Sequence, residues 1–397
     1  MSNGKLYNLQ ELSVMLANVD RTLVSLLARR MDLALQVFAF KKSQALKKAK
    51  EEGKDPAEAK LKIEVIRADK EIERVDKAAI WAELIGLNPL FARGMMYEII
   101  NESCKVQLGA MQSDKADIRF DDHATSDEWY EALKANLLEL TRHVASGYDQ
   151  AYSEQASFST AIYRQFEQRI IQGLIDKLPN KSLALDLGCA TGPMTFHLAD
   201  YFTQVQGVDI SPEMIKIAQE KKQTLSIDNV AFSVADIEQG LEVSDGTVSL
   251  VVLNLGTASD VRNLKTVMKE IERVLRPGGK VLLSFYNKDA LIYQFDFIPW
   301  PVSLMAEINF KAQCLEVHIP EHEPFLVYAN GYNAEEAEAM FQGKMEMDDV
   351  FSFPTISPIL PKHLLENDKI RQQIELVERF LENSTSGSYL IATGTKR

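Results

Sequence analysis

The stretch from Leu183 to Gly192 reads Leu-Ala-Leu-Asp-Leu-Gly-Cys-Ala-Thr-Gly, and it decides the fold of the longer part of the chain. A short apolar run passes through Asp186 into a turn of small residues, and apolar residues at helical spacing follow it. This order predicts a buried strand, a tight turn and a crossover helix. Gly188 and Gly192 suit the turn, because a side chain at either position would hold the backbone away from a ligand or force a strained conformation.

Two acidic residues stand at the ends of the next predicted strands. Strand 205–208 ends in Asp209, about twenty residues after the turn, where a carboxylate suits two ribose hydroxyls. Strand 230–234 ends in Asp236, which is placed to reach an adenine amino group. Ala190 stands where the usual dinucleotide fingerprint has its middle glycine, and the turn lacks the Lys-Ser/Thr pair of a P-loop. These features favour a ligand with ribose and adenine but without pyrophosphate.

Four motifs in order, within roughly residues 181–287, carry a family resemblance: Asp186 to Gly192, Gly207 to Met214, Ala235-Asp236, and Leu275 to Gly279. They resemble the class I S-adenosylmethionine-dependent methyltransferases. The resemblance implies a Rossmann-like α/β fold with a mostly parallel seven-stranded sheet. It also implies S-adenosyl-L-methionine as cofactor, S-adenosyl-L-homocysteine as product, and no metal. The cofactor-binding residues that it implies are Asp186, Gly188, Cys189, Ala190, Gly192, Asp209, Ile210, Met214, Asp236, Ile237 and Asn254. A Rossmann-type dehydrogenase or a ligand-free copy of the fold is the alternative.

Composition limits the other function classes. A chain of 397 residues favours two domains over one. The 57 acidic and 44 basic residues give a net charge of −13, which argues against a nucleic-acid partner bound through phosphates. No apolar run has the length of a membrane span, and the N-terminus lacks a signal-peptide core. Three scattered cysteines do not suggest a disulfide framework, so we expect a cytoplasmic protein without membrane attachment.

The first third of the chain is predicted to be helical. Apolar positions recur at helical spacing from Leu9 to about Glu52, and further helices are expected at 57–84 and from Pro89 to about Gln112, the last capped by Asn88. Three helices cannot bury so wide an apolar stripe alone, whereas two paired chains would. Residues 6–112 resemble the all-helical chorismate mutases, which form intertwined dimers. The resemblance therefore implies a homodimer through this domain.

The same resemblance implies a pocket for a chorismate-type acid. Its residues would be Arg30, Lys41, Arg67, Lys70, Glu71, Ser103 and Gln107. The family has an arginine where Ser13 stands and another where Lys70 stands, and Arg67 replaces an expected acid. Losing a guanidinium removes a bidentate clamp on a carboxylate. The domain is accordingly expected to serve dimerisation or ligand sensing, or else to bind or convert a shikimate-derived acid with Arg67 filling the gap.

The predicted domain organisation follows from these patterns. The helical domain covers 1–112, a linker covers 113–127, and the methyltransferase domain covers 128–397 with a lid (128–180), a core (181–287) and an acceptor insertion (288–345). Beyond the strands already given, we expect strands at 248–253 and 280–285. A helix at 362–382 and a closing antiparallel strand at 389–393 complete the prediction.

The acceptor side of the site is predicted from strand ends and aromatic composition. Ligands bind beyond the carboxyl ends of strands in open α/β sheets, and the 287–345 segment is rich in aromatic residues. The acceptor-side candidates are Tyr148, Tyr152, Asn254, Tyr286, Asn287, Tyr293, Asp296, Trp300 and Asn309. The sequence identifies no general base, and Pro320 between His318 and His322 argues against a metal site there.

The function expected from the sequence is methyl transfer to a small molecule, with O-methylation of a small acid as the economical case because a carboxylate needs no base. One alternative is a bifunctional enzyme whose helical domain also binds or converts chorismate or isochorismate. Another is a helical domain that senses an aromatic metabolite, and a third is a use of S-adenosylmethionine other than methyl transfer, such as its cyclisation.

Overall fold

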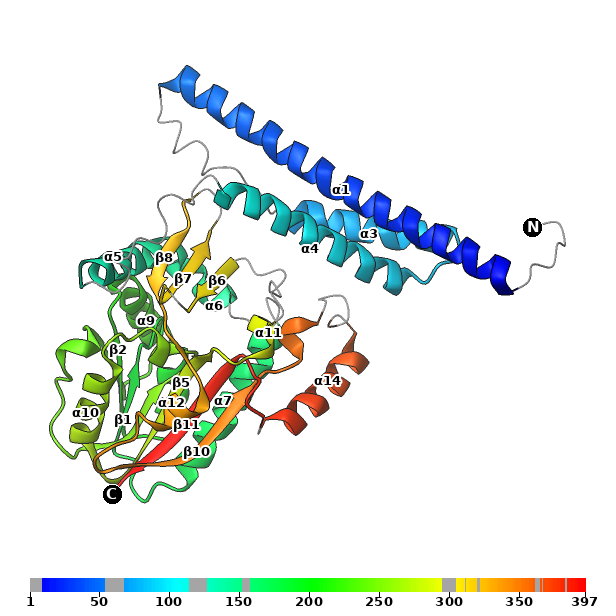
Figure 1. The fold of residues 1–397 in the computed structure, drawn as a ribbon. Coiled ribbons are helices and arrows are strands. Elements are labelled where there is room, and N and C mark those ends of the chain that lie inside the picture. The colour runs from blue at the N-terminus through cyan, green and yellow to red at the C-terminus, as the bar shows by residue number, and fades with distance from the viewer. Residues whose placement is uncertain are drawn as a thin grey trace. The chain divides into compact units, whose positions relative to one another are not determined.

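The structure is a computed structural model, and its elements are labelled in Figure 1. It describes residues 9–53, 68–113, 127–151, 158–294, 305–310, 312–319, 322–360, 365, 367–382 and 384–397. The chain divides into two compact units. The first contains Met1–Phe120 and Pro320–Glu323, and the second contains Asp121–Ile319 and Pro324–Arg397.

The described part of the first unit consists of helices α1 (Leu9–Glu52), α3 (Ala68–Leu84) and α4 (Pro89–Ser113). The predicted bounds of the first and third helices are confirmed, and Asn88 Oδ1 accepts a hydrogen bond from Leu90 N at 2.9 Å as an N-cap. The predicted start of the second helix, 57–67, lies outside the described residues. A small core of residues such as Phe38, Val75 and Ile100 joins the three helices.

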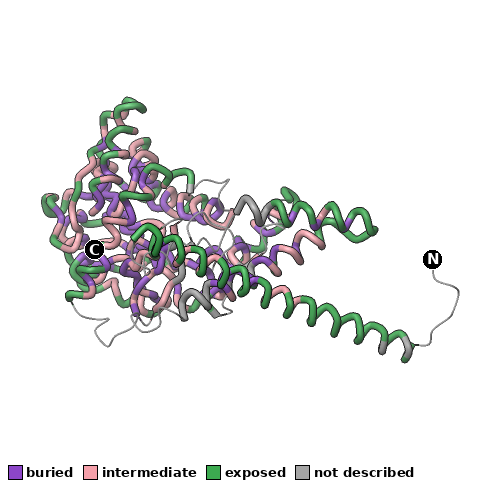
Figure 2. The backbone as a smooth tube through the Cα atoms, turned by 90° about the horizontal axis from the view of Figure 1, so that it is seen from above, coloured by how far each residue is buried: buried purple, intermediate pink, exposed green. Residues whose placement is uncertain are grey.

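The N-terminal half of α1 is exposed within the single chain, as the green run that begins beside the N-terminal trace in Figure 2 shows. Its apolar side chains include Leu16 at 64% and Val19 at 63% exposure. An apolar stripe left in water on a long helix is a surface that another helix can cover.

The second unit is built on one large sheet with the strand order β10-β11-β5-β4-β1-β2-β3, and β9 pairs with β5 beside this path. Five strands pair with one another in parallel: β1 (Leu183–Leu187), β2 (Gln204–Asp209), β3 (Val230–Val234), β4 (Val248–Leu253) and β5 (Leu275–Asn287). The remaining strands of this sheet are β9 (Gly331–Tyr332), β10 (Met345–Phe353) and β11 (Tyr389–Lys396). The Rossmann-like, mostly parallel sheet is confirmed.

Two parts of the sheet structure differ from the prediction. The predicted antiparallel strand is present as β11, but it is not at the edge, because β10 pairs with its outer side. A separate antiparallel sheet lies in the predicted acceptor insertion, formed by β6 (Met305–Asn309), β7 (Cys314–His318) and β8 (Phe325–Tyr328). No strand was predicted in either segment, although Leu315-Glu316-Val317-His318 in β7 and Met345-Glu346-Met347-Asp348 in β10 alternate between apolar and polar residues.

Helices cover both faces of the large sheet. Alternate residues of β4 belong to different cores: Leu250 and Val252 pack with α7 and α8, whereas Val251 and Leu253 pack with α10. The helices of this unit with at least five residues are α5 (Asp127–Val144), α7 (Phe158–Asp176), α8 (Pro193–Ala199), α9 (Pro212–Leu225), α10 (Leu264–Val274), α12 (Ala334–Glu338) and α14 (Asp368–Leu381). The shorter helical segments are η1 (Ala145–Gly147), α6 (Tyr148–Ala151), η2 (Ile237–Gln239), η3 (Thr257–Ser259), α11 (Leu291–Gln294) and η4 (Ser357–Ile359). Among the described helices, none is both long and apolar enough to span a bilayer.

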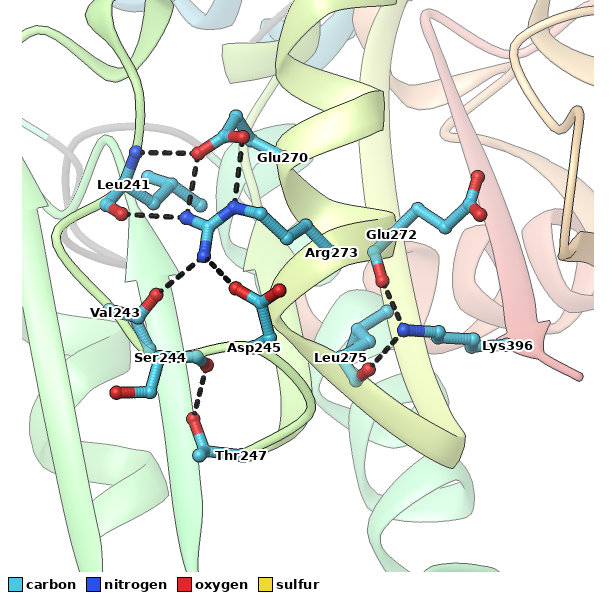
Figure 3. A network of polar contacts seen from close by, with 10 residues as sticks. All are labelled: Leu241, Val243, Ser244, Asp245, Thr247, Glu270, Glu272, Arg273, Leu275 and Lys396. Carbon is cyan, nitrogen blue, oxygen red and sulfur yellow. Dashed lines mark hydrogen bonds and ion pairs between the residues drawn. The ribbon is translucent and has the colours of Figure 1, made fainter.

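The loop before β4 is fixed to α10 by Arg273 (Figure 3). Its guanidinium donates to the carbonyls of Leu241 and Val243 and pairs with Asp245 at 2.6 Å and Glu270 at 2.8 Å. Asp245 is 78% exposed, so its ion pair with Arg273 contributes little to stability.

Candidate functional site

A cavity of about 270 Å³ lies in the second unit. Its wall includes the residues that follow four parallel strands, namely the turn after β1, Asp209 at the end of β2, Ala235 after β3 and Asn254 after β4. Side chains of α5 and α7 also line it. This is the position at which open α/β sheets bind ligands.

The turn after β1 has a backbone that only small residues accept easily. Gly188, Ala190 and Gly192 have φ angles of +77°, +47° and +87°. A side chain in this left-handed region costs roughly 1–2 kcal/mol, so Ala190 is a strained residue at the cavity wall. A Cβ atom on Gly188 would lie 2.4 Å from Thr257 Cγ2. The glycine therefore keeps open a space between the turn and the segment after β4.

Asp209 fixes the shape of the same turn. Its Oδ2 accepts a hydrogen bond from Ala190 N at 2.8 Å, and its Oδ1 accepts one from Ser211 N at 2.9 Å. Burial raises the pKa of this carboxyl group, while the bonds from Ser211 and Ala190 oppose the rise. Asp209 lines the cavity and can accept further hydrogen bonds from a ligand hydroxyl group.

Asp186 lies beneath the turn and is fully buried. Thr195 Oγ1 donates to its Oδ2 at 2.6 Å, whereas its buried Oδ1 has no hydrogen-bond partner among the described residues. Burial raises the pKa of Asp186 to about 7. An unpaired oxygen at this depth is costly to the folded protein unless a ligand or water supplies a donor.

This buried carboxyl group should make stability depend on pH. Its pKa is 3.8 in an unfolded chain and about 7 in the fold, so between these values the folded protein binds more protons. The contribution of Asp186 to the free energy of unfolding therefore falls as the pH rises from about 4 to about 7. Urea denaturation should show a steeper decline between pH 5 and pH 8 for the parent than for Asp186→Asn, which cannot titrate. Equal slopes would contradict this assignment.

The cavity is covered on one side by α5, which is tied to the residues after β3. Lys134 Nζ pairs with Asp236 Oδ2 at 2.7 Å, and the Tyr130 hydroxyl donates to Glu238 Oε2 at 2.8 Å. Burial alone would raise the pKa of Asp236, but the bond from Lys134 holds it below its usual value. Asp236 therefore stays ionised and keeps acceptor capacity beside the cavity.

The next segment, α6, is also tied to the turn. Asp149 Oδ1 accepts a hydrogen bond from Thr191 Oγ1 at 2.7 Å, and Lys221 of α9 pairs with the same carboxylate. In α5, Thr141 shares a hydrogen bond of 2.9 Å with Ser211. These contacts hold the lid segments against the turn and the start of α9.

Sequence reasoning missed Glu167 of α7, which lines the cavity and is 1% exposed. Its Oε1 accepts hydrogen bonds from Leu255 N at 3.1 Å and from the Tyr163 hydroxyl at 2.9 Å. The Tyr163 hydroxyl also contacts Ser284 Oγ at 2.5 Å, and that oxygen accepts from Gly256 N. A signal existed, because Glu167 stands on the apolar stripe of its helix, four residues after Tyr163 and four before Ile171.

Further cavity residues were also missed because long-range packing brings them to the wall. They are Tyr130, Lys134, Arg164, Gln168, Asp260, Tyr328 and Tyr389. Asp260 accepts a hydrogen bond from Tyr286, but burial raises its pKa to about 8. The cavity thus contains several tyrosines and more acidic than basic groups.

Most of the predicted cofactor-binding residues line the cavity: Gly188, Cys189, Ala190, Asp209, Ile210, Met214, Asp236, Ile237 and Asn254. Asp186 and Gly192 lie behind this wall, in β1 and at the N-cap of α8. Their proposed role in binding remains a prediction.

The acceptor-side candidates divide into three groups. Tyr148, Asn254 and Tyr286 line the cavity, whereas Tyr152, Asp296 and Trp300 lie outside the described residues. Asn287, Tyr293 and Asn309 are described but are not among the lining residues. The Asn287 amide donates to the carbonyls of Thr385 and Gly387, Asn309 Oδ1 accepts from Ala312 N, and the Tyr293 ring packs edge-on against Phe310.

In the first unit, two predicted pocket residues meet. Arg30 of α1 donates to Ser103 Oγ of α4 at 2.8 Å, and Gln107 is buried one turn further along α4. Burial and the neighbouring Arg74 lower the pKa of Arg30. Lys41 is half-buried, Arg67 lies outside the described residues, and the side chains of Lys70 and Glu71 are likewise not described.

Two family models match different parts of the chain. Residues 180–351 match the methyltransferase domain model, and residues 13–108 match the model of chorismate mutase type II. The sterol 4-C-methyltransferase strm-1 of Caenorhabditis elegans is 35% identical over 111 residues, which cover 26% of this chain and 33% of that protein. The demethylmenaquinone methyltransferase of Bacillus licheniformis is 33% identical over 108 residues, which cover 26% and 45%. The chain thus spans less than half the length of these curated relatives.

A solved structure of an S-adenosylmethionine-dependent methyltransferase from Clostridium acetobutylicum is also similar. It is 15% identical, with a TM-score of 0.44, and the match covers 65% of this chain and 98% of that one.

Proposed function

We propose that this chain, which contains a methyltransferase domain and a chorismate mutase type II domain, transfers a methyl group from S-adenosyl-L-methionine to a small molecule. The observation that carries the proposal is the cavity after β1, β2 and β4, where the glycine turn and Asp209 line one wall. The proposed acceptor binds in the same cavity, beside the tyrosines and the segment that follows β4.

The residues present fit an adenosine that bears an amino-acid chain. Gly188 keeps open the space that a Cβ atom would fill, and Asp209 has acceptor capacity for ribose hydroxyls. Asp236 would accept from the adenine amino group, with Ile210 and Ile237 as apolar neighbours. The unpartnered Oδ1 of Asp186 would attract the positive end of the ligand, directly or through water.

When bound, the sulfonium group supplies an electrophilic methyl carbon. The protein then has to align the acceptor with that carbon and to exclude water from the cavity. Tyr148, Tyr286 and Tyr389 line the cavity, so their rings can pack against an acceptor and orient it. The electron-rich rings also suit a nearby cation.

Methyl transfer can be tested before the acceptor is identified. The protein would be incubated with isotopically labelled S-adenosyl-L-methionine and an extract of small metabolites, and the products would be identified by mass spectrometry. The proposal expects a labelled small molecule together with S-adenosyl-L-homocysteine. Donor turnover without label in any acceptor would favour a non-methylating use of the same donor, and no turnover would contradict the proposal.

The helical domain is proposed to make the protein a homodimer. Support comes from the apolar stripe of α1, where Leu16 and Val19 are more than 60% exposed in the single chain. Leu16→Glu should weaken the dimer by about 10²-fold or more, because pairing would bury an unpaired carboxylate. Ser25→Glu, on the opposite side of α1, should leave the dimer intact. Sedimentation velocity distinguishes these results, and a monomeric parent protein would contradict the proposal.

A second role for the helical domain, ligand sensing or conversion, is favoured by the Arg30–Ser103 contact. A half-buried guanidinium whose hydroxyl partner lies on another helix is a suitable carboxylate contact. The affinity for S-adenosyl-L-homocysteine would be measured with and without chorismate and prephenate. Because coupling between sites is reciprocal, an unchanged affinity would rule out sensing. Direct assay of chorismate turnover tests conversion.

A further inference from the structure

We propose that Glu167 is the general base of the transfer reaction and that the acceptor is a neutral hydroxyl compound, such as a phenol, which must lose a proton. This inference rests on the proposed function. It assigns a catalytic residue that the sequence did not reveal, and it changes the expected acceptor from a small acid to a protic nucleophile.

The Glu167 carboxylate lies at the cavity wall, beside the segment that follows β4. Glu167 is one of the residues that line the cavity, and it bonds directly to the backbone of Leu255, two residues after the end of β4. Asn254 and Leu255 line the same wall. Glu167 is also close enough to Asp186, beneath the glycine turn, for the two carboxylates to interact. The group therefore lies between the turn proposed to bind the donor and the lid side of the cavity.

The hydrogen bonds that Glu167 accepts fall on one of its two carboxylate oxygens. Both donors, Leu255 N and the Tyr163 hydroxyl, bond to Oε1. Within the described part of the chain, no residue donates a hydrogen bond to Oε2. The contacts at Oε1 fix the carboxylate and leave Oε2 able to accept a proton from a ligand in the cavity.

The side chains that line the cavity include more acidic than basic groups. The acidic residues that line the cavity are Asp149, Glu167, Asp209, Asp236, Glu238 and Asp260, and the basic ones are Lys134 and Arg164. Burial keeps Asp260, with a pKa of about 8, largely protonated at neutral pH, but the other acidic residues still outnumber the two basic ones, which disfavours an anionic acceptor. Burial and Asp186 raise the pKa of Glu167 to about 7, whereas Leu255 N, Tyr163 and Arg164 act in the opposite direction. At neutral pH a substantial fraction of Glu167 is therefore ionised, as a base requires.

The step balances with this residue alone. The acceptor hydroxyl gives its proton to Glu167 Oε2, and the acceptor oxygen forms its new bond to the methyl carbon. The electron pair of the broken carbon–sulfur bond stays on sulfur. One positive and one negative charge disappear together, and the protonated Glu167 afterwards loses its proton to water.

Glu167→Gln tests the inference because an amide oxygen still accepts hydrogen bonds from Leu255 N and Tyr163 but cannot take a proton. With labelled S-adenosyl-L-methionine and the metabolite extract as probes, we expect label incorporation to fall by about 10²-fold. The affinity for S-adenosyl-L-homocysteine should stay within a few-fold of the parent value. Glu378→Gln is the control, since Glu378 is a fully buried carboxylate that binds three backbone N–H groups outside the cavity lining.

The pH dependence of label incorporation distinguishes a catalytic base from a carboxylate that has only a structural role. Incorporation by the parent should rise with pH through about 7, and Tyr163→Phe should move this rise to higher pH because it removes a bond that lowers the pKa of Glu167. Infrared spectra of the ligand-free protein should contain protonated carboxyl absorption that titrates near pH 7 from both Glu167 and Asp186, and the Glu167 part should be missing from Glu167→Gln. Equal incorporation by Glu167→Gln and the parent, or product methylated on a carboxylate, would overturn the inference alone. No incorporation by the parent would overturn the proposed function as well.

Discussion

Replacing Asp209 with alanine is expected to weaken the binding of S-adenosyl-L-homocysteine by about 10²- to 10⁴-fold. The proposed contacts with two ribose hydroxyls are hydrogen bonds to a charged group, each worth about 1.5–3 kcal/mol. The carboxylate also accepts hydrogen bonds from Ala190 N and Ser211 N, so its loss frees the turn from the shape that the ligand needs. Calorimetric titration of the variant and the parent gives the ratio of the two Kd values.

Asp245→Ala is the matched control for this substitution. It also removes an aspartate that pairs within the second unit, but Asp245 is largely exposed, and neither Asp245 nor its partner Arg273 (Figure 3) is among the residues that line the cavity. Binding by Asp245→Ala should equal that of the parent. If Asp209→Ala, still folded by circular dichroism, bound as tightly as the parent, the assignment of Asp209 to the ribose would be wrong.

Gly188→Ala is expected to abolish measurable binding of the same ligand. Its Cβ would lie 2.4 Å from Thr257 Cγ2, so the turn or Thr257 must shift, and the wall proposed to bind the donor changes shape. The substitution also places a side chain at a φ of +77°, which costs roughly 1–2 kcal/mol of stability. Thermal unfolding and calorimetry measure the two effects separately.

Gly246→Ala is the control, because alanine at this position also has an unfavourable positive φ but makes no steric clash. Gly246 has a φ of +64°, and a Cβ atom there meets nothing within 4 Å. We expect a similar conformational cost in stability but unchanged ligand affinity. Gly188→Ala with normal affinity would show that the space beside the turn is not used by the ligand.

The sequence predicted best those features that are determined by residues close together in the chain. The turn after β1 needs glycine for its backbone and for close approach, and Asp209 ends a strand, so both could be placed from their immediate neighbours in the chain. The same holds for α1 and for the Asn88 cap, where periodicity and capping chemistry act within a few residues. Local rules therefore predicted residues that line the cavity on the side proposed to bind the donor.

The residues that the sequence did not reveal depend on long-range packing. Lys134 reaches Asp236 over a separation of 102 residues, and Tyr163 contacts Ser284 over 121. Asn287 is the last residue of β5, but its amide donates to the carbonyls of Thr385 and Gly387, which the local pattern could not indicate. Strand β10 pairs with β11, which follows it in the chain only after α14, so its place in the sheet also depends on long-range pairing.

A crystal structure of the protein with S-adenosyl-L-homocysteine tests the central claim most directly. The account predicts the nucleoside in the cavity after β1, β2 and β4, with its ribose hydroxyls on Asp209, its adenine beside Asp236 and its sulfur on the side of Leu255. A ligand bound elsewhere, or a cavity that stays without nucleoside at a saturating concentration, would contradict it.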